Sequence, residues 1–307
     1  NNKGTVSAAT RARVEAILKQ NNYTPSAIAR GMVSKSMRTV AVLTVDIRVP
    51  HYARTAYTIE REFSRRGYEV ILCNTGGDRA ETLRYLQAVN QKQVDGIVLV
   101  GSVFDTICQG TEMEKLLTGV PVVLANGKLD LPNAYSVTVD DKYGVSLAVE
   151  HLVARGRKNI YYIKDRDTDS AKSKRDGFLE AMRRNGLEFA DHVLEAGETL
   201  ASGMETVQAL LAQGIVPDGI VCGEDLTAAG ALKALLRAGL RVPGQVAVVG
   251  FNNSDYAHLC EPVLTSVDNK PEQVALLCVQ LLESSIERSE AYSSVVLQPE
   301  LAQGETS

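Results

Sequence analysis

Two kinds of segment alternate along the chain from Thr39 onward. Short continuous runs of apolar, often β-branched residues, such as 40–45 and 96–100, are typical of strands buried on both faces of a sheet. Between them lie longer stretches in which apolar residues recur every three or four positions, as in 52–66, which predicts amphipathic helices. Strands that alternate with helices in this way indicate a parallel sheet covered by helices on both sides.

This strand–helix pattern runs to about residue 124 and starts again near residue 143. The predicted strands span 40–45, 69–73, 96–100, 120–124, 159–163, 192–195, 219–222, 245–250 and about 294–297, and the predicted helices span 52–66, 79–91, 112–117, 143–155, 173–185, 202–213, 226–238 and 271–284. The repetition predicts a fold of two tandem doubly wound parallel-sheet α/β domains. Ligands of such sheets bind at the carboxyl ends of the strands, so we expect a ligand cleft between the domains.

The first 38 residues differ from this body in pattern and in charge. Residues 7–22 predict a helix, and Pro25 can begin a second helix over 26–32 that is too short and polar to be stable without a partner. Residues 1–38 contain seven basic residues and one acidic residue, whereas the whole chain has a net charge of −4. A basic arm on an acidic body suggests a polyanionic partner, with a solvated basic helix as the alternative.

Composition and motifs exclude several classes of protein. The 307-residue sequence contains no apolar run of the roughly 18 residues that a membrane span needs, and it shows no export signal. Its five cysteines are isolated, which argues against a zinc site or a disulfide framework and favours a reducing cytoplasm. The sequence lacks dinucleotide, phosphate-loop and serine-hydrolase motifs, and its four histidines lack metal-ligand spacing. We therefore expect no catalytic residues, no cofactor and no metal.

Eight short motifs stand in order along the chain. They are VSAATRARV at 6–14, NYTPSAIAR at 22–30, VDGI at 94–97, PVVL at 121–124, VTVD at 137–140, KRDGF at 174–178, EDLTAAGAL at 224–232 and VVGFNN at 248–253. Taken together, they resemble the bacterial lactose/galactose repressor (LacI/GalR) family of transcriptional regulators over the whole chain. The resemblance implies an N-terminal helix-turn-helix headpiece, a hinge helix, and a two-domain effector module similar to periplasmic sugar-binding proteins.

The resemblance also implies how the N-terminal arm meets DNA. Residues 1–24 would be the last part of the headpiece, whose first two helices are expected before residue 1, and residues 25–38 would be the hinge helix and linker. The DNA-binding positions would be Tyr23, Ser26, Arg30 and Met32. Met32 matches an apolar residue that wedges apart a base step in the minor groove, although it could instead cover the effector module. Tyr23 and Arg30 could instead be solvated surface.

Six effector-binding positions follow from the same resemblance. They are His51 and Tyr52 at the start of the module's first helix, Asp140 at the first crossing between domains, Arg175 as the arginine of an RxxG(F/Y) motif, and Glu224 and Asn252 in the cleft. Relatives commonly have Asn at the position of Glu224 and Asp at the position of Asn252. This chain would therefore gain a negative charge at the first position and lose one at the second. Arg175 and Glu224 could instead belong to a helix cap or a salt bridge within one domain. Asp225 is interpreted as a helix cap.

These inferences predict a cytoplasmic transcriptional regulator, specifically a repressor and not an enzyme, whose operator affinity is set by a bound sugar or related metabolite. Its partners would be palindromic operator DNA, the effector and a second copy in a homodimer, with no membrane. The N-subdomain would contain 39–137 and 268–293, and the C-subdomain 138–267 and 294–307. The alternative function is a solute-binding protein of the periplasmic type, which would need a signal peptide or a lipid anchor.

Overall fold

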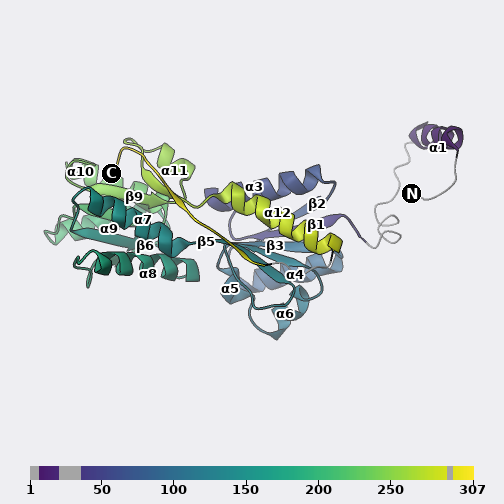
Figure 1. The fold of residues 1–307 in the computed structure, drawn as a ribbon, viewed down its shortest axis with the longest axis horizontal. Helices are drawn as coiled ribbons and strands as arrows, with labels where there is room; N and C mark the ends of the chain where they lie inside the picture. The colour runs from purple at the N-terminus through teal and green to yellow at the C-terminus, as the bar shows by residue number, and fades with distance from the viewer. Residues whose placement is uncertain (1–6, 21–35, 289–292) are drawn as a thin grey trace.

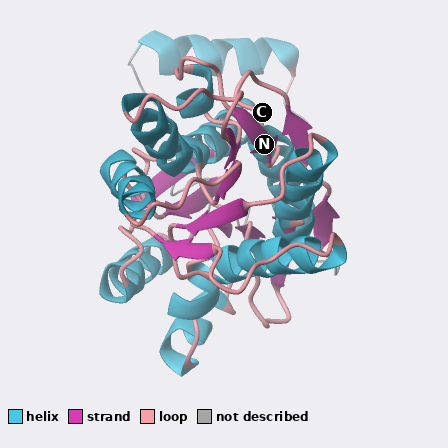
Figure 2. Ribbon diagram, turned by 90° about the vertical axis from the view of Figure 1, so that its left-hand side faces the viewer, coloured by secondary structure: helices cyan, strands magenta, loops and turns pink. Residues whose placement is uncertain are grey.

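The computed structural model describes residues 7–20, 36–288 and 293–307, which include two α/β subdomains arranged end to end (Figure 1). Each subdomain has a central six-stranded sheet. Figure 2 shows the strands surrounded by helices. The predicted fold class of two tandem doubly wound domains is confirmed.

The N-subdomain sheet is entirely parallel, with the strand order β11-β5-β4-β3-β1-β2. Its strands are β1 (Thr39–Thr44), β2 (Glu69–Asn74), β3 (Gly96–Val100), β4 (Val122–Ala125), β5 (Ala134–Val139) and β11 (Val295–Leu297). Helices α3 (Pro50–Arg65) and α12 (Pro271–Arg288) cover one face, and α4 (Arg79–Gln91), α5 (Phe104–Ile107) and α6 (Thr111–Leu117) cover the other. Every residue of β1 and β3 is buried, which explains their continuous apolar runs.

The C-subdomain repeats this plan, with the strand order β12-β10-β9-β8-β6-β7. Its strands are β6 (Ile160–Lys164), β7 (Val193–Glu195), β8 (Gly219–Cys222), β9 (Ala247–Phe251), β10 (Thr265–Asp268) and β12 (Glu300–Ala302), of which only β12 runs antiparallel among the described strands. Helices α7 (Asp141–Ala154) and α8 (Asp169–Arg184) pack on one face, and α9 (Leu200–Ala212) and α10 (Asp225–Arg237) pack on the other, with α11 (Asp255–His258) beside α10.

The chain passes between the subdomains three times. The crossings follow β5, β10 and β11, because β11 pairs with β5 in the first sheet while β12 pairs with β10 in the second. The predicted boundary at residue 293/294 was therefore misplaced: residues 295–297 complete the N-subdomain sheet. The expected boundaries at 137/138 and 267/268 also fall slightly early, since β5 continues to Val139 and β10 to Asp268.

Helices α7 and α8 approach each other closely at Gly177. A Cβ atom on Gly177 would lie 2.2 Å from the backbone oxygen of Lys142 in α7. Only glycine permits this contact, because two backbone segments cannot both move aside without loss of their own hydrogen bonds. The third turn of α8 therefore lies directly against the start of α7.

Three strands and two short helices were not predicted. The strand β10 contains the sequence Thr-Ser-Val-Asp, which has little apolar character, yet Thr265 and Ser266 are fully buried. The Ser266 hydroxyl donates to the Asp225 carboxylate, and the Thr265 backbone N–H donates to the Thr306 hydroxyl. Such distant partners satisfy polar groups that the local sequence pattern assigns to a surface. The strands β5 and β12 and the helices α5 and α11 are the other unpredicted elements.

Within the first 38 residues, the structure describes 36–38 and 7–20, and the latter contain α1 (Ala8–Gln20), where a helix was predicted over 7–22. The four predicted DNA-binding residues, Tyr23, Ser26, Arg30 and Met32, lie outside the described residues. No described helix has the combination of length and apolar character that crossing a membrane requires.

Candidate ligand-binding site

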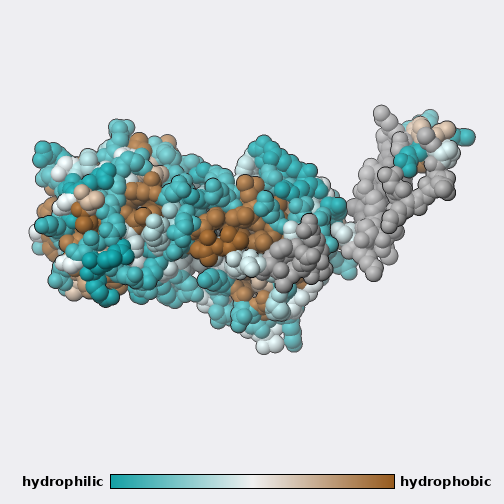
Figure 3. Space-filling model, viewed as in Figure 1, coloured by the Kyte–Doolittle hydropathy of each residue, from teal (hydrophilic) through white to brown (hydrophobic). Residues whose placement is uncertain are grey.

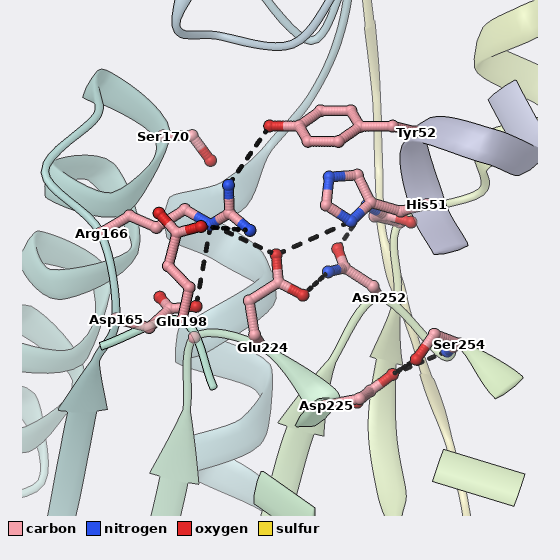
Figure 4. Close-up of polar contacts among 12 residues, drawn as sticks. His51, Tyr52, Asp165, Arg166, Ser170, Glu198, Glu224, Asp225, Asn252 and Ser254 are labelled. Carbon is pink, nitrogen blue, oxygen red and sulfur yellow. Dashed lines mark hydrogen bonds and ion pairs between the residues drawn. The ribbon is translucent and has the colours of Figure 1, made fainter. Parts of the chain in front are cut away.

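Polar side chains from both subdomains converge between the carboxyl ends of the two sheets (Figure 4). They enclose a cavity of about 50 Å³ whose lining comes from the start of α3, the ends of β3, β4, β6, β8 and β9, the first turns of α7 and α8, and the segment after β10. The lining residues are His51, Tyr52, Thr55, Val100, Gly101, Ser102, Asn126, Asp141, Asp165, Arg166, Thr168, Ser170, Ala171, Lys174, Glu224, Asn252 and Asn269. This is the location predicted for ligands of doubly wound sheets.

Glu224 lies at the centre of the polar contacts. One of its carboxylate oxygens accepts a hydrogen bond of 2.5 Å from the Asn252 Nδ2, while the other lies 3.8 Å from the His51 Nδ1. Asn252 in turn accepts a hydrogen bond of 2.6 Å from the Asn269 Nδ2. The chain of contacts therefore joins β8, β9 and the segment after β10 through side chains alone.

Arg166 extends from the end of β6 toward the N-subdomain. Its Nη1 lies 3.5 Å from the Tyr52 hydroxyl, and its Nε lies 3.9 Å from a carboxylate oxygen of Glu224. The guanidinium also pairs with Glu198, whose side chain is 53% exposed, at 3.3 Å. Arg166 itself is only 15% exposed. A buried guanidinium between two carboxylates and a phenol can donate to a ligand from a fixed position.

An aromatic wall closes the N-subdomain side of the cavity. The rings of His51 and Tyr52 have centroids 4.0 Å apart, and the Arg166 guanidinium lies 5.9 Å from the centroid of the Tyr52 ring. Burial, together with the positive charges of Arg166 and Lys174, holds the pKa of His51 well below its usual value. His51 is therefore neutral at pH 7 and offers one donor and one acceptor. Burial raises the pKa of Tyr52 to about 12, so its hydroxyl stays protonated.

Lys174 supplies a second cation on the opposite wall. Its Nζ donates to the backbone oxygen of Gly223 at 2.9 Å and lies 3.8 Å from the centroid of the Phe251 ring. The residue is buried in the first half of α8. Lys174 thus places a positive charge beneath the cavity, close to the carboxylates at the ends of β6 and β8.

Four polar atoms in the lining are buried without a hydrogen-bond partner among the described residues. They are the Asn126 Oδ1, Asp165 Oδ2, Arg166 Nε and Asn269 Oδ1 atoms. Buried polar atoms are normally paired, and an unpaired one costs about 1–3 kcal/mol. The Asp165 Oδ2 and Arg166 Nε atoms lie 3.9 Å apart as an ion pair, whereas the Asn126 and Asn269 oxygens are free to accept, so a ligand with hydroxyl groups can donate to them.

Burial also perturbs the acids of the cavity. It raises the pKa of Asp165 to about 6, with the Glu224 charge adding to the effect, and it raises the pKa of Glu224 and of Asp141. Lys174 and Arg166 act in the opposite direction on Glu224 without overcoming burial. The cavity therefore holds its negative charges at a free-energy cost, which a ligand that donates hydrogen bonds can reduce.

The structure brings four of the six predicted effector residues together, namely His51, Tyr52, Glu224 and Asn252. Asp140 lies at the edge, where its carboxylate caps α7 by accepting from the Tyr143 N–H, and it lines an adjoining cavity instead. Whether these residues bind an effector stays a prediction. Asp225 is not a cap of its own helix: its buried carboxylate accepts from Ser254 and Ser266.

Arg175 does not line the cavity, contrary to its prediction as an effector-binding residue. Its side chain is 40% exposed and pairs with the neighbouring Asp176 at 2.8 Å, outside the cavity. The RxxG(F/Y) spacing puts the cation three residues before the glycine, and counting back from Gly177 gives Lys174. Adjacent residues of a helix differ by about 100° in direction, so Lys174 faces the cavity while Arg175 points away from it.

Arg166, Asp165, Lys174 and Asn269 were missed by sequence reasoning. Asp165 and Arg166 directly follow the buried strand β6, and Asn269 follows β10. Polar residues that immediately follow buried strands were therefore the available signal for Asp165 and Arg166, whereas β10 itself was not predicted. Within the described residues, no group of three or more histidine, cysteine, aspartate or glutamate side chains is arranged to hold a metal ion.

Comparison with known proteins gives consistent matches. A family model described as a periplasmic binding protein-like domain matches residues 149–307. An HTH-type transcriptional regulator of Lachnoclostridium phytofermentans is 31% identical over 92% of this chain and 86% of its own length. The ribose operon repressor of Escherichia coli K12 is 30% identical over 90% of this chain and 84% of its own. The Lac repressor dimer bound to operator and an anti-inducer has the same fold, with a TM-score of 0.88 at 23% identity over 100% of this chain and 92% of that one.

Proposed function

The chain belongs to the LacI/GalR family of bacterial transcriptional regulators, and we propose that a small polyhydroxylated effector controls it from the cleft between the two subdomains. The observation that carries this proposal is the set of buried polar atoms in the cavity lining that have no hydrogen-bond partner among the described residues, above all the Asn126 and Asn269 oxygens. A sugar or related polyol would satisfy them through its hydroxyl groups, beside the neutral His51 and Tyr52 side chains. The ribose operon repressor among the relatives supports this ligand class.

Contacts across the cleft give a physical basis for control. Arg166 of the C-subdomain reaches Tyr52 of the N-subdomain at 3.5 Å, and the Arg54 side chain donates to the backbone oxygen of Asn253 at 3.4 Å. An effector that contacts both walls would stabilise one relative position of the subdomains over another. The difference in its affinity for the two positions is the free energy available for regulation.

The chain is anchored to the N-subdomain at residues 37 and 39, at the end of the N-terminal arm. The Asp95 carboxylate accepts from the backbone N–H groups of Met37 and Thr39, at 3.1 and 2.9 Å. These two bonds fix the chain where the arm enters β1. In the proposed mechanism, effector binding shifts the two N-subdomains of a homodimer, and the arms gain or lose their grip on palindromic operator DNA through Tyr23, Ser26, Arg30 and Met32.

Regulation is favoured over the solute-binding alternative because the relatives named above are a transcriptional regulator and a repressor. The same relatives are not enzymes, and we assign this chain no catalytic activity. Since its target would be operator DNA, we place the protein in the cytoplasm. We also propose that the protein acts as a repressor, in line with its similarity to the ribose operon repressor.

The proposed effector class is tested by thermal-shift screening of the purified protein against neutral sugars, sugar phosphates and nucleobases. A ligand that binds only the folded state raises the melting temperature, by an amount that grows with its concentration relative to Kd. We expect at least one neutral sugar to raise it, and the Lys174→Met variant to lose most of that response. A response to nucleobases alone would contradict the assignment to polyols.

A further inference from the structure

A second and much larger cavity adjoins the effector cavity. It has a volume of about 880 Å³ and lies between α5, α6 and the β4–β5 loop of the N-subdomain and the first turns of α7 and α8 of the C-subdomain. The two cavities share four lining residues, Ser102, Asn126, Asp141 and Ser170. We call the cavity around Glu224 the inner cavity (about 50 Å³) and the larger one the outer cavity (about 880 Å³).

The two volumes differ in what they can hold. A space of about 50 Å³ accommodates one or two water molecules, whereas small-molecule sites usually enclose about 300–1,000 Å³. The inner cavity has the fixed polar groups that give specificity, and the outer cavity has the room. Only a ligand that extends through both would use the unpartnered atoms of the inner cavity and also fill the outer one.

The wall that the two cavities share contains polar groups that a ligand extending through both could contact. The buried Asn126 Oδ1 has no partner among the described residues, and its residue adopts a positive φ of 58° at the end of β4. On the opposite side, the Ser170 hydroxyl donates to the Asp141 carboxylate at 2.6 Å. The Asn126 oxygen of the N-subdomain and the Ser170 hydroxyl of the C-subdomain thus lie on opposite sides of the junction between the two cavities.

The outer cavity has a strongly acidic lining. Its charged residues are Asp105, Glu114, Asp130, Asp140, Asp141 and Asp169 against a single cation, Lys128. The backbone N–H of Lys128 donates to the Asp105 carboxylate at 2.7 Å, and burial raises the pKa of that carboxyl group to about 7. Apolar side chains of Leu129, Leu131 and Val296 complete the lining. Carboxylates beside apolar patches suit sugar rings, which present hydroxyl edges and apolar faces, and they repel phosphate.

We propose that the effector is a non-anionic oligosaccharide or glycoside, whose first ring lies at the shared wall with its hydroxyl groups reaching into the inner cavity, and whose remainder occupies the outer cavity. This inference rests on the proposed function and adds the size and charge of the effector to it. It predicts that a single sugar ring is an incomplete ligand, and that a phosphate group on the ligand weakens binding.

The test measures affinities by calorimetry for three sets of compounds on the whole protein. The first set is ribose, glucose and galactose; the second is cellobiose, maltose, lactose and trehalose; the third is glucose 6-phosphate and trehalose 6-phosphate. We expect a member of the second set to bind at least about tenfold more tightly than its component monosaccharides, a difference of about 1.4 kcal/mol. Neither phosphorylated compound should bind as tightly as its neutral counterpart.

Two variants of α8 connect the result to the outer cavity. Ser173→Trp places a bulky side chain in the outer cavity, which Ser173 lines without touching the inner one. Asp176→Trp is the control, since Asp176 is 53% exposed on the same helix and lines neither cavity. Ser173→Trp should remove most of the disaccharide's advantage and leave monosaccharide binding nearly unchanged, whereas Asp176→Trp should change neither.

The contrary outcomes separate the two proposals. A monosaccharide that binds as tightly as every disaccharide containing it would overturn the extended effector and leave the proposed function standing. Tighter binding of a phosphorylated compound would overturn the argument from charge. Loss of disaccharide binding in Asp176→Trp and not in Ser173→Trp would place the extension elsewhere. Failure of every sugar to bind would overturn both proposals.

Discussion

The Glu224→Gln variant separates two effects of the buried carboxylate. One is its effect on the free energy of unfolding of the free protein, and the other is its contribution to effector affinity. At 3.9 Å, the attraction between Glu224 and Arg166 amounts to about 4 kcal/mol at an effective dielectric constant of about 20. Burial nevertheless raises the pKa of Glu224, so desolvation of the carboxylate outweighs this attraction and that of Lys174. Keeping the group ionised in the empty cleft therefore reduces the free energy of unfolding.

Glutamine has nearly the same shape and can still accept the hydrogen bond from Asn252. We expect Glu224→Gln to leave the free energy of unfolding unchanged within about 1 kcal/mol, or to increase it. Effector binding should weaken by about 1.5–3 kcal/mol, the contribution of a hydrogen bond to a charged group, which is about 10- to 150-fold in Kd. Urea denaturation of the free protein and calorimetry with the effector found by screening measure the two quantities.

Glu198→Gln is a matched control, because Glu198 pairs with the same guanidinium at 3.3 Å but is 53% exposed. An exposed pair contributes less than about 1 kcal/mol, so this variant should change neither quantity appreciably. The reasoning would be refuted if Glu224→Gln destabilised the free protein by several kcal/mol while effector affinity stayed the same. Equal losses of affinity in both variants would show that the buried position of Glu224 has no special role.

Three further predictions follow from individual contacts. Lys174→Met should weaken effector binding at least about tenfold, whereas Arg175→Ala, next to it but pointing outward, should leave Kd within about twofold in the same calorimetric titration. The raised pKa of Asp165, about 6 in the fold, means that the folded state binds more protons than the unfolded state between about pH 4 and 6. Its contribution to stability is therefore lost as pH rises through that window, and denaturation at several pH values should show Asp165→Asn reducing the loss by up to about 3 kcal/mol. Gly177→Ala should lower the free energy of unfolding by about 1–3 kcal/mol, since the new Cβ would lie 2.2 Å from the Lys142 backbone oxygen. This loss should exceed the gain from the better helix propensity of alanine. Urea denaturation that shows a stability equal to the wild type would contradict this packing argument.

Most of the fold is predictable from the sequence because its central strands are buried on both faces. Strands β1, β3 and β8 have apolar runs that need no knowledge of distant partners. Strand β10 was missed for the opposite reason: the burial of Ser266 depends on Asp225, which is remote in sequence. Strand β11 was detected but assigned to the wrong subdomain, since only pairing with β5 decides its place.

Glu224 and Asn252 were located by the resemblance to the family, whereas Asp165 and Arg166 were missed although they directly follow a predicted strand. Arg175 was chosen in place of Lys174 because the spacing of the RxxG(F/Y) motif was counted one residue too late. The width of the cleft, the adjoining outer cavity and the pairing of Arg166 with Tyr52 arise from how the two subdomains meet. Local sequence patterns contain no information about that arrangement.

The central claim is that occupancy of the cleft sets the affinity for DNA. Its most direct test is a fluorescence-anisotropy titration of the full-length protein on a palindromic duplex that the protein itself selects from a random pool. The titration is performed at one salt concentration, with and without saturating effector. The account predicts that the effector changes Kd for this duplex at least about fivefold, the lower range of allosteric coupling, and that Lys174→Met abolishes the change while binding the duplex normally. An effector that occupies the cleft and leaves Kd for the duplex unchanged would contradict it.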